Sequence, residues 1–240
     1  MRQEHQATTD GAGATVVGVL CPMTVEARPF LVRMDNLRLV NGRSYKTYEG
    51  SLLGKSVVLT ISGVGIAKAK AASEALLLTR PSCLIVSGVA GATEASLGLT
   101  ETVVATETVY HDLPDQVVLE RCPDLTNAVF QSDPVLLDRT RKVVADQPTS
   151  QPVRLGRIAS GASFVTKSQR AKIIERTNPI AVDMETAAAA EVCHLHKVPF
   201  LAVRSISDTA DNASFLNFLK YARPAAKNAF EVTALLLSAL

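Results

Sequence analysis

Two short apolar segments of this chain end in carboxylates. Residues 180–185, Ile-Ala-Val-Asp-Met-Glu, form an apolar run that finishes in acids and leads into an alanine-rich helical pattern over residues 186–196. Residues 200–208 again have the pattern of a buried strand, and this strand ends at Asp208. Open α/β sheets bind their ligands at the carboxyl ends of such strands. The two segments therefore predict an α/β fold with a ligand site at one edge of the sheet.

Short Val/Ile/Leu runs alternate with helical patterns along the chain, which is typical of parallel strands joined by crossover helices. Two segments of alternating polar and apolar residues flank a Leu-Leu-Gly-Lys sequence and predict an antiparallel hairpin. We therefore expect a mixed, mostly parallel central sheet. The expected strands are residues 15–21, 45–51, 56–62, 84–89, 101–110, 153–160, 180–184 and 201–207, and the expected helices include residues 67–78, 186–196 and 214–240.

The composition fits a single α/β domain. A chain of 240 residues with 47% hydrophobic content can bury one sizeable core without disulfides or metals. The 25 basic and 23 acidic residues nearly cancel, which argues against nucleic acid or an anionic membrane surface as a partner. The four cysteines form no Cys-x-x-Cys motif, a usage typical of reduced thiols in a cytoplasmic protein.

The first residues of the chain differ from the rest. Residues 1–14 are polar and contain no apolar stretch of the kind that a secretory signal has, so we interpret them as a flexible tail. The domain is expected to span residues 15–240. No apolar run approaches the roughly 18 residues that a membrane-spanning helix needs, and we expect a soluble protein without a membrane partner.

Two glycine-rich segments follow predicted strands. They are Ser-Gly-Val-Gly-Ile-Ala-Lys at residues 62–68 and Ser-Gly-Val-Ala-Gly-Ala at residues 87–92. Glycine permits a ligand to approach the backbone closely near a helix N-terminus. The first segment lacks the third glycine of a dinucleotide fingerprint and the Gly-Lys-Ser/Thr of a P-loop, which excludes both motifs. A tight turn or close packing remains an equal explanation.

Each candidate acid also has a purely structural explanation. Glu26 follows the first predicted strand, where it would also serve as a helix-entry charge. Asp208 would also suit the N-cap of a following helix. Asp183 and Glu185 share a face if the strand continues through Met184, whereas an early start of the helix separates them. The sequence leaves these alternatives open.

The histidines are weaker candidates than the acids. His194 and His196 lie about 200° apart around a helix, which makes them a poor pair of metal ligands. His111 ends a predicted strand and is more simply a structural residue. The chain contains neither a Gly-x-Ser-x-Gly elbow nor a His-Glu-x-x-His motif. Carboxylates are therefore the plausible catalytic groups, and no metal is expected.

Six short segments of the chain match, in order and in spacing, the motifs of one protein family. From residue 16 onward the chain resembles the nucleoside phosphorylase/nucleosidase superfamily, and most closely its 5′-methylthioadenosine/S-adenosylhomocysteine nucleosidases. The resemblance implies a single-domain, three-layer α/β/α fold with a nucleoside phosphorylase-like sheet. The segments are Ser-Gly-Val-Gly-Ile-Ala-Lys-Ala at 62–69, Ser-Gly-Val-Ala-Gly at 87–91, Tyr-His-Asp at 110–112, Ser-Gly-Ala-Ser-Phe at 160–164, Ala-Val-Asp-Met-Glu-Thr-Ala at 181–187 and Val-Arg-Ser-Ile-Ser-Asp-Thr-Ala-Asp at 203–211.

The resemblance also implies an activity and roles for individual residues. It implies hydrolysis of the bond between base and ribose in a 5′-substituted adenosine. Asp208 matches the acid that holds a proton toward purine N7, so that the base leaves as a neutral molecule. Glu26 matches the carboxylate that orients and deprotonates the attacking water. Glu185 matches the residue that binds the ribose hydroxyls and favours a developing cation.

Further residues are assigned to substrate binding through the same resemblance. Met184 would pack beneath the sugar and Phe164 would stack on the base. The remaining predicted contacts to substrate are Asp183, Val89, Gly91, Arg204, Ser207 and Met23. The resemblance further implies a homodimer and no cofactor, with a small nucleoside as the only other partner and with no nucleic acid.

Three departures from the family pattern leave the substrate open. Val89 stands where these nucleosidases place a serine, Asp183 is one methylene shorter than their usual glutamate, and Met23-Thr-Val-Glu26 replaces a more acidic run. A phosphate-dependent phosphorylase is the nearest alternative. It is disfavoured because the carboxylate of Glu26 would repel a bound phosphate, although Arg28 lies close by in sequence. An inactive nucleoside-binding protein is the third possibility.

Overall fold

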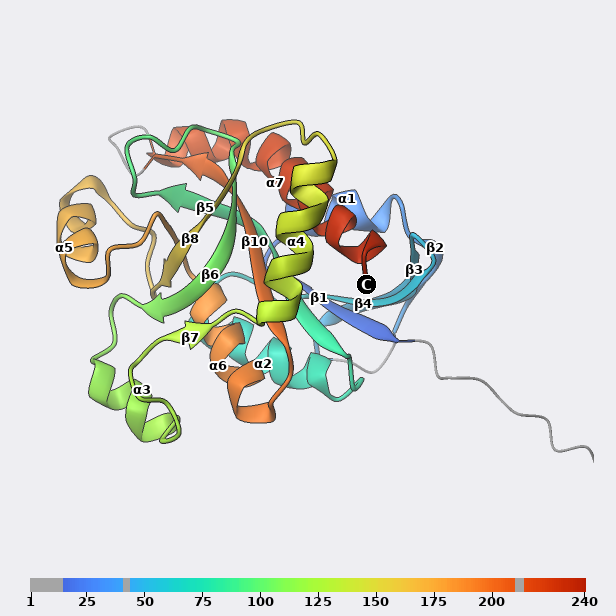
Figure 1. Cartoon of the computed structure of the whole chain (residues 1–240), viewed down its shortest axis with the longest axis horizontal. Helices are drawn as coiled ribbons and strands as arrows, with labels where there is room; N and C mark the ends of the chain where they lie inside the picture. Colours follow the sequence, from blue (N-terminus) through green and yellow to red (C-terminus); the bar gives the residue numbers. More distant parts are fainter. Residues whose placement is uncertain (1–14, 41–43, 210–213) are drawn as a thin grey trace, which may run out of the picture.

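The computed structural model describes residues 15–40, 44–209 and 214–240, and the tail predicted at residues 1–14 lies outside them. One sheet forms the centre of the molecule (Figure 1). In chain order the elements are β1 (Val16–Cys21), α1 (Thr24–Leu31), β2 (Asp35–Leu39), β3 (Lys46–Leu52), β4 (Lys55–Ile61), α2 (Ile66–Leu77), β5 (Cys83–Ala92), β6 (Thr102–Tyr110), α3 (Asp115–Arg121), β7 (Phe130–Gln131), α4 (Pro134–Asp146), β8 (Val153–Ser160), α5 (Lys167–Thr177), β9 (Ala181–Asp183), α6 (Thr186–His196), β10 (Phe200–Asp208) and α7 (Ser214–Ser238).

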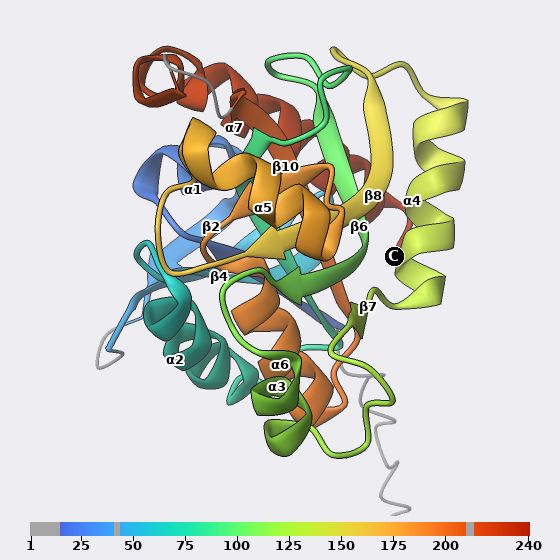
Figure 2. The same ribbon diagram turned by 90° about the vertical axis from the view of Figure 1, so that its left-hand side faces the viewer.

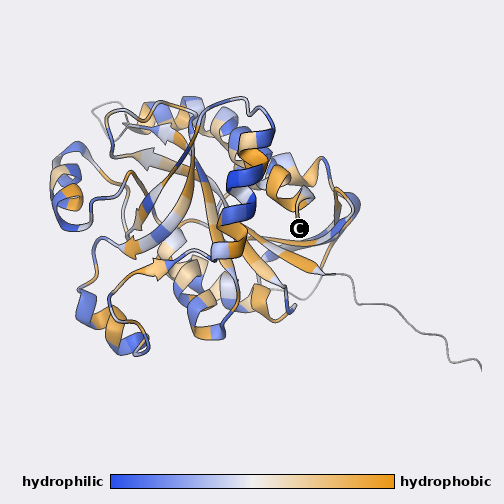
Figure 3. Cartoon of the chain, in the orientation of Figure 1, coloured by the Kyte–Doolittle hydropathy of each residue, from blue (hydrophilic) through white to orange (hydrophobic). Residues whose placement is uncertain are grey.

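The strands β1 and β5 form the buried centre of the sheet because their side chains are covered on both faces. Alternate residues of a strand point to opposite faces. Leu84 and Val86 of β5 join a core cluster with residues of α2 and α6, whereas Cys83 and Ile85 join a second cluster with residues of α1, α4 and α7. The apolar strands therefore lie between two helical layers, as their continuous apolar runs predicted (Figure 3).

The predicted mixed α/β sheet is confirmed. Its long pairings β1–β4, β5–β10 and β6–β8 are parallel, and the predicted hairpin β3–β4 is antiparallel. Strand β5 pairs with β10, β10 with β6, β6 with β8, β8 with β9, and β9 returns to β5. These five strands close a ring, which the sequence pattern did not indicate. The ring brings the ends of β5, β9 and β10 together, since Gly91 of β5 pairs with Val182 of β9 and with Asp208 of β10.

Several details differ from the pattern-based expectation. Strand β9 contains only Ala181–Asp183 and runs antiparallel to β5, so Met184 and Glu185 lie outside it. The edge strand β2 was not predicted, because all five of its residues are exposed and it carries no buried apolar pattern. Helices α3, α4 and α5 were also not predicted. They cover the periphery and do not supply the catalytic carboxylates proposed below.

Candidate active site

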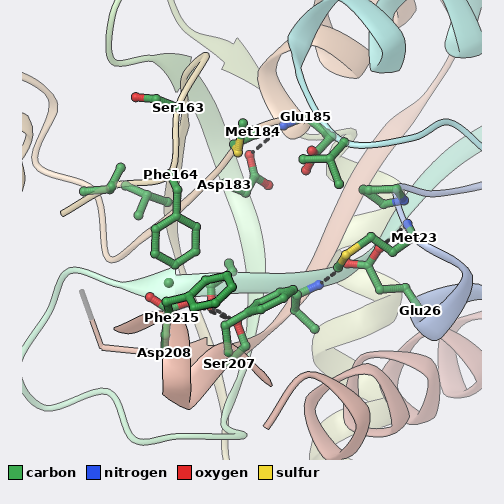
Figure 4. Close-up of a pocket in the computed structure, with 18 residues that line it drawn as sticks. Met23, Glu26, Ser163, Phe164, Asp183, Met184, Glu185, Ser207, Asp208 and Phe215 are labelled. Carbon is green, nitrogen blue, oxygen red and sulfur yellow. Dashed lines mark hydrogen bonds between the residues drawn. The ribbon is translucent and has the colours of Figure 1, made fainter. Parts of the chain in front are cut away.

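A cavity of about 360 Å³ opens where β1, β5, β9 and β10 end. Figure 4 shows Asp208 and Ser207 on one side of it, Glu26 and Met23 on another, and the chain from Asp183 to Glu185 across from both. The cavity is lined by Pro22, Met23, Glu26, Val64, Val89, Ala90, Gly91, Ser163, Phe164, Val165, Val182, Asp183, Met184, Glu185, Ser207, Asp208, Phe215 and Phe218. The strand ends that carry acids thus meet at one site, as predicted.

Arg204 of β10 lies behind the wall of this cavity and is completely buried. Its Nε lies 2.9 Å from Asp183 Oδ2, its Nη2 lies 3.4 Å from Glu185 Oε2, and its Nη1 lies 3.7 Å from Glu26 Oε1. We call Arg204 and these three acids the Arg204 cluster. Arg204 does not itself line the cavity but contacts these three acids behind its wall, and its predicted contact with substrate stays a prediction.

The charges of the Arg204 cluster shape one another. Burial lowers the pKa of Arg204, but Asp183, Glu185 and Glu26 more than reverse this, so that its pKa is raised and the guanidinium stays charged. A planar guanidinium can bond several carboxylates at once, which an ammonium cannot do in the same geometry. One positive charge therefore holds three acids in place.

Glu26 occupies the first turn of α1 and is held by three groups. Its Oε2 accepts the Met23 N–H at 2.6 Å, and its Oε1 accepts the Val89 N–H at 2.8 Å beside Arg204. Burial raises the pKa of Glu26 to about 8, since it outweighs Arg204 and the backbone donors. Glu26 thus makes the helix-entry contact expected of its position and still presents a carboxyl group to the cavity.

Close approach at Gly88 is required for this arrangement. A Cβ atom at Gly88 would lie 2.3 Å from Glu26 Oε1 and 2.5 Å from Arg204 Nη1. Any side chain at this position would push apart the ion pair that it faces. The glycine-rich end of β5 therefore serves the packing of charged groups, which was one of its two open explanations.

Asp183 is the last residue of β9 and Glu185 is the N-cap of α6, so both contact Arg204 but their other partners differ. Asp183 Oδ1 accepts the Thr186 N–H at 3.1 Å and the Ser160 hydroxyl at 2.5 Å, and its Oδ2 pairs with Arg204. Its side chain is only 2% exposed. Asp183 was predicted as a substrate contact, but its oxygens are engaged in holding Arg204 and the start of α6.

Glu185 is the N-cap of α6 and faces the cavity. Its Oε1 accepts the Gly65 N–H at 2.8 Å, so the glycine-rich turn before α2 binds this carboxylate at the helix N-terminus. Burial raises the pKa of Glu185 to about 7 against the opposing effect of Arg204, and Asp183 raises it further. Glu185 and Glu26 are therefore two buried acids that titrate near neutral pH.

Asp208 is the last residue of β10 and is 3% exposed. Asp208 belongs to β10 and Thr209 is not helical, while residues 210–213, on which its N-cap interpretation depends, lie outside the described residues. The Ser207 hydroxyl donates to Asp208 Oδ2 at 3.1 Å. A Cβ atom at Gly91 would lie 2.8 Å from Asp208 Oδ1, so Gly91 leaves room for the carboxyl group beside the cavity.

The remaining walls of the cavity are mostly apolar. Met23, Met184, Val89 and Phe164 line it as the sequence predicted. Sequence reasoning missed the aromatic rings of α7 and several small wall residues. Phe218 meets Phe164 edge to face at 6.4 Å between ring centroids, and only its helical spacing from Phe215 hinted that both share one face. The missed residues are Pro22, Val64, Ala90, Ser163, Val165, Val182, Phe215 and Phe218.

The arrangement favours a neutral or cation-like ligand. Four carboxyl groups line the cavity, and none of the lining residues in the described parts of the chain is Lys or Arg. Within residues 15–40, 44–209 and 214–240, no group of three or more His, Cys, Asp or Glu side chains is placed to hold a metal ion. In the same residues no helix has both the length and the apolar character to cross a membrane.

Residues 16–238 match the family described as the Phosphorylase superfamily. The chain belongs to this superfamily. Two relatives are 5′-methylthioadenosine/S-adenosylhomocysteine nucleosidases. The protein from Staphylococcus epidermidis is 31% identical over 94% of this chain and 100% of its own, and the protein from Tolumonas auensis is 32% identical over 93% and 99%.

Solved structures of the superfamily share the fold. The 5′-methylthioadenosine/S-adenosylhomocysteine nucleosidase of Neisseria meningitidis, in complex with methylthio-immucillin-A, has a TM-score of 0.87 at 30% identity and covers 94% of this chain and 100% of its own. The nucleosidase of Colwellia psychrerythraea, in complex with adenine, has a TM-score of 0.87 at 27% identity, over 95% and 96%. The predicted resemblance, fold and enzyme class, an N-glycosyl hydrolase, are confirmed by these relatives.

The raised pKa of Glu26 predicts a specific dependence of stability on pH. A carboxyl group whose pKa rises from 4.5 to about 8 on folding stabilises the folded state fully below pH 4.5, and this contribution is lost as the pH rises through 8. Between pH 5.5 and 8.5, Glu26→Gln should therefore lose less unfolding free energy than the wild type, by an amount on the order of 2–3 kcal/mol. Urea unfolding at both pH values measures this.

The matched control for this experiment is Glu120→Gln, which removes an exposed carboxylate on α3. It should follow the wild-type dependence on pH. If Glu26→Gln also follows the wild type, then the carboxyl group of Glu26 is not protonated at neutral pH in the folded protein.

Proposed function

We propose that this protein hydrolyses the N-glycosidic bond of a 5′-substituted adenosine, with the activity of a 5′-methylthioadenosine/S-adenosylhomocysteine nucleosidase. The observation that carries the proposal is the convergence of Glu26, Glu185 and Asp208 on one cavity whose other walls are mostly apolar. Relatives with this fold are named as nucleosidases of such nucleosides, and the structure of one of them contains adenine.

The proposed reaction begins with departure of the base. The C1′–N9 bond breaks and its electron pair moves onto the purine, while Asp208 delivers a proton to N7 so that the base leaves neutral. The Ser207 hydroxyl holds the Asp208 carboxyl group in place. Phe164 stacks on the base and Met184 packs beneath the sugar. Val89 and Met23 supply apolar wall around the ribose, and Gly91 leaves space for Asp208.

The sugar then carries positive charge at C1′ and is attacked by water. Glu26, in its ionised form, orients the water and takes its proton as the C1′–O bond forms. Glu185 accepts hydrogen bonds from the ribose hydroxyls, and its negative charge stabilises the cation-like transition state in a site of low dielectric constant. Asp183 and Arg204 keep both glutamates in position.

Hydrolysis fits the site better than phosphorolysis. A phosphate nucleophile requires cations or backbone N–H groups directed at it. No Lys or Arg is among the described residues that line the cavity, and Arg204 already serves three carboxylates behind it. The first candidate for such a cation, Arg28, is exposed and does not line the cavity.

We further propose that the protein acts in the cytoplasm as a homodimer whose second subunit borders the cavity. All four cysteines are free and buried, as suits a reducing compartment.

Apolar side chains at the start of α7 are exposed beside the cavity and are available to a second subunit. Phe215, Leu216 and Leu219 are 63%, 69% and 61% exposed. No metal or cofactor enters the proposed reaction.

Product analysis tests the proposed reaction directly. The protein is incubated with methylthioadenosine, S-adenosylhomocysteine, adenosine and inosine, with and without phosphate, and the products are separated by chromatography. We expect free base and free sugar without phosphate. Methylthioadenosine should be cleaved fastest, because Met23, Val64 and Phe218 suit an apolar 5′ group. Formation of sugar 1-phosphate only with phosphate would establish a phosphorylase, and absence of cleavage would indicate a binding protein.

The variant Asp208→Asn tests the acid. It should lower kcat by about 100- to 10,000-fold while KM changes by less than about tenfold, since loss of one general acid removes this much rate. A riboside with 4-nitrophenolate as leaving group needs no proton and should lose far less rate in the same variant. Asp146→Asn, at the exposed end of α4, is the matched control. Equal losses on both substrates would contradict the acid role.

A further inference from the structure

A second cavity lies outside the active site, on the outer surface of α1 and α7. It has a volume of about 460 Å³ and shares no lining residue with the main cavity. Both views of the fold place α1 beside α7 (Figures 1 and 2). We call it the basic groove, and it is lined by Thr24, Val25, Arg28, Pro29, Val32, Arg33, Arg223 and Lys227.

Four cations and no carboxylate line the basic groove. Arg28 lies on α1 and Arg33 lies just beyond its end, while Arg223 and Lys227 are one helical turn apart on α7. All four are exposed, and none forms a salt bridge with any residue in the described parts of the chain. Like charges held this close repel one another unless an anion joins them.

Several basic residues elsewhere on the surface have an acidic partner. Arg157 pairs with Glu107, Arg154 pairs with Glu101, and Lys142 pairs with Asp138. The chain as a whole is nearly neutral, with a net charge of +2. A local excess of four positive charges in a concave site is therefore a property of this groove and does not follow from a basic surface in general.

Arg33 is held in place before any ligand binds. Its Nη1 donates to the Pro29 carbonyl at 3.1 Å, and its guanidinium lies 4.9 Å from the ring centroid of Phe230. Phe230 itself packs edge to face on Phe30 at 4.8 Å in the core. A guanidinium that is already fixed loses little conformational entropy on binding an anion.

We propose that the basic groove binds a small ligand that carries a chain of phosphate groups. Guanidinium groups match phosphate oxygens in a bidentate geometry, and three of the four cations are arginines. The volume is that of a small-molecule site rather than of an extended track along a nucleic acid. Val25, Pro29 and Val32 add an apolar wall, against which the organic part of a nucleotide can pack.

Calorimetric titration of the intact protein tests this proposal. The probes are tripolyphosphate, cytidine triphosphate and orthophosphate at an ionic strength of about 50 mM, where charge attraction is weakly screened. Cytidine triphosphate is chosen because it carries no purine for the main cavity. We expect one ligand per chain for the first two probes, and at least about tenfold weaker binding of orthophosphate. Tighter binding of the nucleotide than of tripolyphosphate indicates a nucleotide ligand, and equal binding indicates recognition of the phosphate chain alone.

Variants locate the binding. The double variant Arg223→Gln with Lys227→Gln should weaken the binding of tripolyphosphate at least about tenfold. The control double variant Arg141→Gln with Lys172→Gln removes two exposed cations elsewhere and should leave this binding unchanged. Thermal unfolding and circular dichroism report whether each variant folds. If the double variant does not fold, Arg28→Gln on the opposite wall of the groove takes its place. No binding, equal binding by all variants, or binding only of a long single-stranded oligonucleotide would each overturn the proposal.

Discussion

The interaction on which the site depends is the buried contact of Arg204 with three carboxylates. Glu26 comes from α1, Asp183 from the end of β9, and Glu185 from the N-cap of α6. Removing such groups from water is costly, and the cost is offset only where opposite charges and further hydrogen bonds compensate it. The guanidinium provides the charge, and the N–H groups of Gly65 and Val89 provide hydrogen bonds. Without Arg204 the three acids would not pack together as anions.

One cation does not neutralise three acids, and this excess determines the chemistry. The pKa of Glu26 and the pKa of Glu185 both move toward neutrality because burial outweighs their attraction to Arg204. A cation that develops next to them would be strongly stabilised, since both oxygens are already oriented when the reaction begins. Either glutamate in its ionised form would repel a phosphate nucleophile. We therefore propose that the site is organised around a positively charged transition state.

The sequence predicted the acids but not how each is used. The strand ends and the spacing of the motifs predicted that Glu26, Glu185 and Asp208 meet at one cavity. The parallel strands β1, β5 and β10 end at the same edge of the sheet, whereas Glu185 reaches it after β9, which runs antiparallel to β5. The alternation of side chains could not settle the role of Asp183, since the strand ends at this residue and its carboxylate contacts Arg204 and Thr186. The ring of five strands and the aromatic wall from α7 depend on contacts between distant segments, which no local pattern records. Arg204 carried no such signal and was assigned to substrate, although it lies behind the acids.

The most direct test of the central claim is the kinetics of Arg204→Lys. This variant keeps the positive charge but loses the planar fork that reaches Asp183, Glu185 and Glu26 together. If the Arg204 cluster positions the two glutamates, kcat/KM for methylthioadenosine should fall at least about 100-fold, with the fold retained by circular dichroism, because misplacement of catalytic groups by about 1 Å has this effect. Near wild-type kcat/KM in a folded Arg204→Lys protein would contradict the account, since charge alone would then suffice.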